Sequence, residues 1–261
     1  MSTKVKKMYV CLCGFEFIPK TISTKDLGGR FYLSEPVCCY LLDTEEGYVL
    51  FDTGFNRDVI TNPELEEKYF TSRGWIPTPV SEEQHDLGVQ LAEIGVGFDE
   101  IKHIVVSHLH ADHTGNIAKC KNAKVYIQRA EYEYGFAPTT PPPWFECDYK
   151  DVAGIDWQIM DGDFKLMEGI EVIDTKGHTP GHQSLILTLP NSGVFVLTAD
   201  AGDLLENYEK EIPCGENIGD DIAIESIRRL KREAAERQGI LFLLHDIDWV
   251  KQIKLIPEYY D

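Results

Sequence analysis

Residues 105–116 read VVSHLHADHTGN and place three histidines and one aspartate within six consecutive positions. The residues before them, IKHIVVS (101–107), form a short and mostly apolar run that predicts a buried strand. A polar cluster directly after a buried strand lies where binding and catalytic groups usually gather, on a loop held by a packed scaffold. This segment is therefore the starting point for both the expected fold and the expected site.

Four residues of the segment have the chemistry of metal ligands. His108 and His110 are two positions apart, so their side chains can share a face as the chain leaves a strand. A turn at Ala111 would then bring Asp112 and His113 round to the other side of the same space. Neutral imidazoles and a carboxylate suit Zn²⁺ and related divalent ions, so one segment can serve two neighbouring ions. The alternative interpretation is a loop of solvated histidines.

Three further candidate ligands stand at the ends of other predicted strands. The strands cover residues 170–175, 193–200 and 240–246, and the polar residues at their ends are His178, Asp200 and His245. Loops above strand ends are where sites assemble, so we expect these side chains to join the histidine segment. Asp200 alone would be a turn residue, but beside the other ligands it becomes a plausible bridge between two metal ions.

The remaining strand-end acid is Asp52, in the run LFDTG (50–54). We expect its carboxylate to orient a ligand histidine, and the alternative is a turn-forming role. His85 and His103 stand alone in the sequence and are expected on the surface or in ordinary packing.

Composition limits the class of protein. The chain has 261 residues, of which 43% are hydrophobic, and this suffices for a single domain over residues 1–261. A net charge of -19 repels nucleic acid and anionic membranes, so a small molecule is the expected partner. No secretory signal or apolar run of roughly 18 residues is visible, and the seven cysteines are odd in number. We therefore expect free thiols in a cytoplasmic protein, monomeric or homodimeric.

Many short strands and few helices predict sheets with helices packed outside them. The two apolar runs joined by a polar turn in residues 37–54 predict a β-hairpin. Residues 81–95 predict a helix with a capping box at Ser81 and Gln84. Residues 220–239 predict a longer helix that begins with acids and ends at a glycine. Further strands are expected at 123–129 and 183–190.

Residues 133–160 differ from the rest of the chain because they are rich in proline and aromatic residues. This composition predicts an irregular loop or lid rather than core, with the role of a variable substrate loop. Trp144, Phe145 and Trp157 are candidates to line an apolar groove that sets the substrate's chain length.

The run HLHADH (108–113) is a His-x-His-x-Asp-His signature, by which the chain resembles the metallo-β-lactamase superfamily. The resemblance continues in order through LFDTG, GHTPGHQSL, LTAD and LLHDI. More narrowly, the chain resembles the N-acyl homoserine lactonases, in the runs CYLLDTEEG, QRAEYE, SIRRLK and the closing HDID and PEYY. The resemblance implies an α/β fold, an αβ/βα four-layer sandwich of two mixed sheets with helices outside and metals at one edge.

The resemblance also implies which residues hold two divalent metal ions, with Zn²⁺ expected and Fe²⁺ or Mn²⁺ as alternatives. The first ion is held by His108, His110 and His178, the second by Asp112, His113 and His245, and Asp200 bridges the two. His182, in the same GHTPGH run as His178, is not a ligand in this pattern and is expected in packing or behind a ligand.

The chain departs from the lactonases at two positions near the expected substrate pocket. The family has a tyrosine three residues after the bridging aspartate, where this chain has Asp203, and often a phenylalanine where this chain has Ala111. Asp203 is a candidate to bind a substrate amide or act as an acid, and the alternative is a solvated loop residue. Tyr208 is a candidate substitute for the missing tyrosine, and the alternative is a surface aromatic.

The expected function is opening of the lactone ring of N-acyl homoserine lactones by a hydroxide held between the two metal ions. Asp112 is expected to shuttle a proton to the leaving oxygen as well as to bind metal. One alternative is a hydrolase of another lactone, ester or thioester, of the glyoxalase II type, although the short tail after His245 leaves little room for a glutathione-binding extension. A non-catalytic metal-binding protein is the alternative from a different class.

Overall fold

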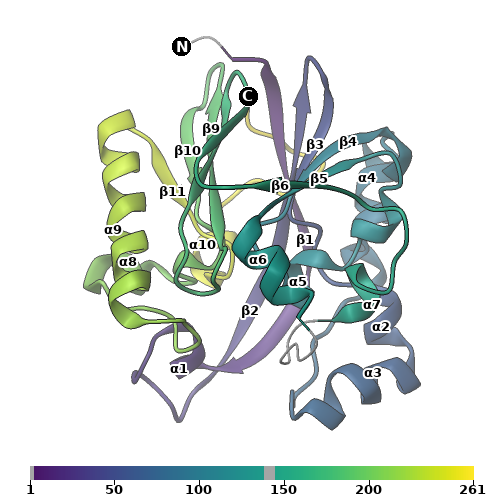
Figure 1. Cartoon of the computed structure of the whole chain (residues 1–261), viewed down its shortest axis with the longest axis vertical. Coiled ribbons are helices and arrows are strands. Elements are labelled where there is room, and N and C mark those ends of the chain that lie inside the picture. The colour runs from purple at the N-terminus through teal and green to yellow at the C-terminus, as the bar shows by residue number, and fades with distance from the viewer. Residues whose placement is uncertain (1–2, 138–144) are drawn as a thin grey trace.

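The computed structural model describes residues 3–137 and 145–261. Two sheets lie face to face, and helices cover the outer face of each (Figure 1). The predicted four-layer sandwich of two mixed sheets is therefore confirmed.

The first sheet contains six strands, and the hairpin predicted at 37–54 joins two of them. Its order is β1 (Val5–Pro19), β2 (Tyr32–Thr44), β3 (Gly47–Phe51), β4 (Ile101–Val105), β5 (Lys124–Gln128) and β6 (Asp156–Met160). The pairs β1–β2 and β2–β3 are antiparallel, and β3 to β6 run parallel. Parallel strands end at the same edge, so the loop after β4 opens beside the end of β3.

The second sheet contains five strands. Its order is β11 (Ile240–Phe242), β10 (Gly193–Leu197), β9 (Gln183–Leu189), β8 (Ile170–Asp174) and β7 (Phe164–Met167). All neighbours are antiparallel except β10 and β11, which are parallel. The strands predicted at 170–175, 183–190, 193–200 and 240–246 are all present, and each ends one to four residues earlier than predicted.

Strand β2 shows why both faces of the first sheet are covered. Cys38, Tyr40 and Leu42 belong to the cluster that fills the space between the sheets. Cys39 and Leu41, which alternate with them, belong to the cluster on the outer face. A strand buried on both faces reads as a continuous apolar run, which is what VCCYLL provides.

Helices close the two outer layers. On the second sheet, α9 (Asp220–Arg237) buries Ile227 and Leu230 against Ile186 and Val196. On the first sheet, residues of α4, α5 and α7 belong to the outer cluster. The other helices are α1 (Lys20–Ser23), α2 (Arg57–Thr61), α3 (Pro63–Tyr69), α4 (Leu87–Glu93), α5 (Ala111–Thr114), α6 (Arg129–Gly135), α7 (Glu146–Tyr149), α8 (Leu205–Lys210) and α10 (Ile247–Val250).

The helix predicted at 81–95 is shorter than expected. Its N-cap is Asp86, whose side chain accepts a hydrogen bond from Val89 N at 3.1 Å, and the helix covers only α4. The predicted capping box at Ser81 and Gln84 is wrong, because Ser81 Oγ donates instead to Cys13 O of β1 at 3.0 Å. The Ser81 hydroxyl, which the local sequence pattern assigned to a helix cap, thus forms a tertiary contact with β1 instead.

The prediction of an irregular stretch over 133–160 is wrong in part, because it contains α7 and β6. Phe145 is buried and packs against Phe70, with ring centroids 4.9 Å apart. Trp157 lies on β6 and packs against Tyr132 and Phe136. Trp144 lies outside the described residues, and the role of the segment as a substrate loop stays a prediction.

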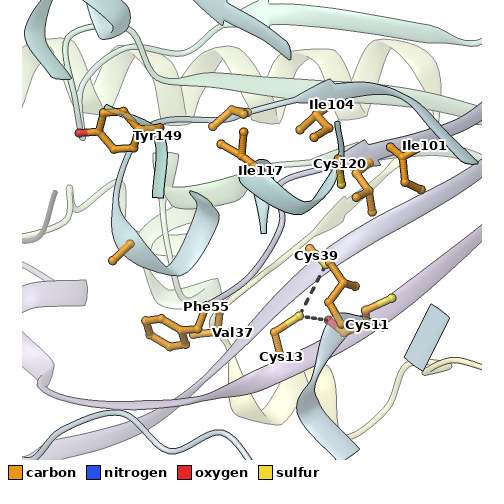
Figure 2. Close-up of a cluster of buried hydrophobic side chains, with 14 of the residues drawn as sticks. Cys11, Cys13, Val37, Cys39, Phe55, Ile101, Ile104, Ile117, Cys120 and Tyr149 are labelled. Carbon is orange, nitrogen blue, oxygen red and sulfur yellow. Dashed lines mark hydrogen bonds between the residues drawn. The ribbon is translucent and has the colours of Figure 1, made fainter. Parts of the chain in front are cut away.

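The seven cysteines are free, as predicted. Cys13 and Cys39 lie on neighbouring strands of the first sheet (Figure 2). Their sulfur atoms are 3.6 Å apart. Burial raises the pKa of the Cys38 thiol well above its usual range, which favours an uncharged thiol. Within residues 3–137 and 145–261, no helix combines the length and apolar character needed to cross a bilayer.

Candidate metal centre

The seven predicted ligands come together at one edge of the sandwich, on the segments that follow β4, β8, β10 and β11. They form two groups that each offer one donor atom per residue, all within 4.8 Å of one another. One group is His108, His110, His178 and Asp200, and the other is Asp112, His113, Asp200 and His245. Asp200 belongs to both groups, which is the arrangement expected of a bridging ligand.

The local backbone differs from the strand geometry that was predicted for the histidine segment. Strand β4 ends at Val105, three residues before His108. His110 is the N-cap of the short helix α5, so Asp112 and His113 lie in its first turn. The helical turn, rather than an extended chain, sends these two side chains to the second group of donors.

Hydrogen bonds from Nδ1 fix the orientation of three of the imidazoles and turn their Nε2 atoms toward other candidate ligands, with His178 Nε2 3.1 Å from His110 Nδ1 and His245 Nε2 3.2 Å from Asp200. Each ring donates from Nδ1 to an oxygen: His113 to Asp52 (2.9 Å), His178 to Glu216 O (3.2 Å) and His245 to Pro36 O (3.0 Å). In its neutral form, a ring that donates from Nδ1 presents an unprotonated Nε2, which is a metal-binding atom. The carboxylates of Asp112 and Asp200 lie 2.9 and 3.3 Å from Nε2 of His113.

Buried donor atoms without partners show that the residues fit a cation. In the described part of the chain, Nε2 of His108, Nε2 of His113 and Oδ1 of Asp200 are buried and form no hydrogen bond. Buried polar atoms are nearly always paired, because an unpaired one costs about 1–3 kcal/mol. Imidazole nitrogens and carboxylate oxygens arranged this way suit two divalent ions.

The electrostatics of the second group also favour positive charge. Burial lowers the pKa of His113, but Asp112, Asp200 and Asp52 outweigh it and raise that pKa well above its usual range. The same balance of burial against Asp200 raises the pKa of His245. Carboxylates that attract a proton this strongly also attract a divalent cation, which would take the proton's place.

Asp52 has the predicted role of orienting a histidine. Its Oδ1 accepts a hydrogen bond from Ser107 N at 2.6 Å while Oδ2 accepts from His113. Its backbone has a φ of 60°, in the left-handed region. Asp and Asn tolerate this region better than most residues, so both the side chain and the conformation call for this residue type.

His182 lies behind Asp200, where it was expected, and belongs to neither of the two donor groups. Its Nδ1 donates to Thr175 O at 3.1 Å, and its Nε2 accepts from Asp200 N at 3.0 Å. Burial lowers the pKa of His182 to about 3, so the ring stays neutral and keeps Nε2 as an acceptor. His182 therefore fixes the backbone from which the Asp200 carboxylate projects.

Glu131 was not predicted from sequence, yet it ties together two of the ligand-bearing loops. Its carboxylate accepts hydrogen bonds from Leu109 N at 3.0 Å, Thr179 Oγ1 at 2.7 Å and Gly181 N at 3.0 Å. Leu109 lies between His108 and His110, and Thr179 follows His178. The available signal was a single acid in QRAEYE, directly after a predicted strand.

Asp203 and Tyr208 are both buried, with 5% and 2% of their surfaces exposed. The alternative interpretations, a solvated loop residue and a surface aromatic, are therefore wrong. Asp203 Oδ1 accepts a hydrogen bond from the thiol of Cys214 at 3.3 Å, and the same sulfur lies 3.7 Å from Asp200 O. Burial, together with Asp200 and Glu35, raises the pKa of Asp203 well above its usual range.

A cavity of about 260 Å³ opens beside the two donor groups. Its lining combines four of the candidate ligands with residues of the first sheet and its connections and with Glu216, from the segment between α8 and α9. The lining residues are Glu16, Ile18, Ile22, Arg73, Gly74, Trp75, His110, Asp112, His178, Asp200 and Glu216. Phe145 and Trp157, which were expected to line an apolar groove, are not among these residues. Asp203 and Tyr208 are not among them either.

Comparisons with known proteins agree with this geometry. Residues 35–243 match the model of the metallo-β-lactamase superfamily. An N-acyl homoserine lactonase of Bacillus cereus is 35% identical over 255 residues, which cover 98% of this chain and 99% of that protein. The N-acyl homoserine lactonase AttM of Rhizobium radiobacter is 32% identical, over 86% of this chain and 87% of that protein.

Among solved structures, an N-acyl homoserine lactone hydrolase superimposes with a TM-score of 0.87 and 31% identity. The match covers 99% of this chain and 100% of that one. That structure holds the product N-hexanoyl-L-homoserine at its catalytic metal centre.

Proposed function

The chain belongs to the metallo-β-lactamase superfamily, among its N-acyl homoserine lactonases, and from this we propose that it opens the lactone ring of N-acyl homoserine lactones. The observation that carries the proposal is the pair of donor groups sharing Asp200 beside the cavity. The product-bound relative supports it, because its ligand lies at a catalytic metal centre. Such an activity would remove homoserine lactone signals, which is quorum quenching.

We propose that two divalent ions, Zn²⁺ first and Fe²⁺ or Mn²⁺ as alternatives, are held by the seven residues. His108, His110 and His178 would hold one ion, Asp112, His113 and His245 the other, and Asp200 both. When bound, such a pair of ions makes hydroxide available near neutral pH and polarises a carbonyl oxygen. The chain's own part is to hold the donors in place through Asp52, His182 and Glu131.

We propose that Asp112 transfers a proton during ring opening as well as binding metal. Its carboxylate lies 2.9 Å from His113 Nε2 and also lines the cavity, so it borders both the donor groups and the substrate space. An oxygen of Asp112 can accept the proton of the attacking water and pass it to the leaving alkoxide. Asp203 and Tyr208 do not line the cavity, so we propose that they support the Asp200 segment rather than contact substrate. Asp203 would do so through the Cys214 thiol, and Tyr208 through the buried cluster that it shares with Ala201.

The test is metal content together with a substrate screen. The protein is purified without chelators and supplied with zinc or manganese, and we expect two ions per chain. Ring opening of homoserine lactones of graded acyl length is then followed by acid release, with simple esters and a glutathione thioester as comparison substrates. Fewer than two ions per chain, or thioester cleavage without lactone opening, would contradict the proposal.

The seven free thiols are consistent with a reducing cytoplasm, and we propose this location. We propose a monomer or a homodimer, which light scattering of the purified protein distinguishes.

A further inference from the structure

Two buried glutamates lie directly opposite each other near the metal centre. Glu16 on β1 pairs with Glu35 on β2 in the antiparallel register, and 7% and 1% of their surfaces are exposed. Like charges directly opposite in a sheet are destabilising, and burial without a cationic partner adds to the cost. Apolar residues would serve the sheet better, so the pair calls for a functional explanation.

The two glutamates face different surroundings. Glu35 accepts a hydrogen bond from Ser23 Oγ and does not line the cavity. Glu16 lines the cavity together with Asp112 and Asp200. Among the described residues, no hydrogen bond reaches the Glu16 carboxyl group, although only 10% of its side chain is exposed.

The nearest charged partner does not satisfy Glu16. Its Oε1 lies 3.8 Å from His245 Nδ1, which is beyond hydrogen-bond distance. The proton on that nitrogen is directed to Pro36 O at 3.0 Å. Glu16 therefore presents a buried and unpartnered acceptor to the cavity, one imidazole ring away from the second donor group.

We propose that Glu16 is a substrate-binding residue, whose carboxyl group accepts a hydrogen bond from the amide N–H of an N-acyl homoserine lactone. This rests on the proposed function. The amide nitrogen of such a substrate is bonded to the carbon next to the scissile carbonyl, so it must lie close to the metal centre. Ile18, Ile22 and Trp75 supply apolar lining for the acyl chain in the same cavity.

The consequence is selectivity for lactones that carry this N–H. A site built around a hydrogen bond rejects an analogue that lacks the donor, because its own buried group is then left unpaired. Leaving a buried acceptor without its donor corresponds to a factor of about 10 to 100 in rate or affinity.

The experiment compares two substrates that differ in the amide. These are N-hexanoyl homoserine lactone and α-hexyl-γ-butyrolactone, which keeps the ring and an alkyl chain but has no N–H. We expect Glu16→Leu to lower kcat/KM by about 10- to 100-fold on the first substrate and by less than about threefold on the second. Glu16→Gln keeps an acceptor oxygen and should lie between Glu16→Leu and the wild type.

Glu35→Gln is the matched control. It removes the opposite acid of the same cross-strand pair, but that residue does not line the cavity. We expect the ratio of the two kcat/KM values to stay at its wild-type level. An equal change in this ratio for Glu35→Gln and Glu16→Gln would assign the effect to the charge of the pair and overturn the proposal.

Two further readouts keep the inference separate from folding and from metal binding. Affinity for the unreactive N-hexanoyl homoserine lactam, measured by calorimetry, should fall with Glu16→Leu by the same factor as kcat/KM. Metal content should stay at the wild-type value in all variants, and loss of an ion in Glu16→Gln would instead make Glu16 a metal ligand. Equal losses on both lactones would overturn the proposal, whereas a wild-type protein inactive on both would contradict the proposed function itself.

Discussion

Asp52 accepts a hydrogen bond from His113 Nδ1 at 2.9 Å, and this contact turns His113 Nε2 toward Asp112, also at 2.9 Å. The two residues are 61 positions apart: Asp52 directly follows β3, and His113 lies in α5, on the segment after the neighbouring parallel strand β4. Asp52 N also donates to Val105 O at 2.9 Å, so both the backbone and the side chain of Asp52 bind the segment that contains β4 and His113. The sheet thus sets the orientation of a candidate ligand.

Replacement of Asp52 by asparagine should weaken metal binding without unfolding the protein. Asparagine tolerates the left-handed backbone at φ 60°, but it cannot accept from both Ser107 N and His113 with carboxylate strength. We expect metal affinity to fall by about 10- to 100-fold, measured by competition with a chromophoric chelator. Unchanged affinity would show that His113 is held by its surroundings alone.

Replacement of Asp112 by asparagine separates the two roles proposed for this residue. Asparagine keeps an oxygen for metal but cannot accept and release a proton at that site. We expect kcat to fall by about 10²- to 10⁴-fold while most of the metal stays bound. Metal analysis of the purified variant is the necessary companion measurement, since a parallel loss of metal would leave only a structural role as ligand.

The sequence was sufficient for the seven candidate ligands because four stand in one short motif and three end predicted strands. It was insufficient for Glu131 and Glu16, whose significance depends on contacts across the fold. Glu131 bonds to residues 22 and 50 positions away, and Glu16 lies on a part of β1 that periodicity alone does not place beside His245. Strand β6 was missed for the same reason, because pairing with β5 overrides the loop-like composition around it.

Loss of Glu131 should loosen both loops that it connects. Glu131→Ala leaves the donors of Leu109, Thr179 and Gly181 without their acceptor in a buried site. We expect the free energy of unfolding to fall by at least about 3 kcal/mol, measured by urea denaturation of the metal-loaded protein. Glu131→Gln keeps one acceptor oxygen and should lose less, so equal losses for the two variants would argue against the hydrogen bonds as the cause.

Asp148 should make the protein less stable as the pH rises through the acidic range. Burial raises the pKa of Asp148 to about 6, while its hydrogen bonds from Asn56 and Thr114 oppose the shift. The pKa of an unfolded aspartate is about 3.9, so between these values the folded state binds the proton more tightly than the unfolded state. The contribution of Asp148 to stability is therefore largest below about pH 4 and is lost by about pH 6, by about 3 kcal/mol in total.

Asp148→Asn removes this dependence, because the amide stays neutral. It still offers an oxygen to Asn56 Nδ2, which lies 2.8 Å from Asp148 Oδ1 in the wild type. The stability difference between variant and wild type should shift in favour of the variant by about 2 kcal/mol from pH 4.5 to pH 8, at about 1.36 kcal/mol for each pH unit below the folded pKa. Urea denaturation of both proteins at the two pH values, with metal saturation matched, measures this difference. An unchanged difference between pH 4.5 and pH 8 would mean that Asp148 stays ionised in its buried site throughout, held by its hydrogen-bond donors against the cost of desolvation.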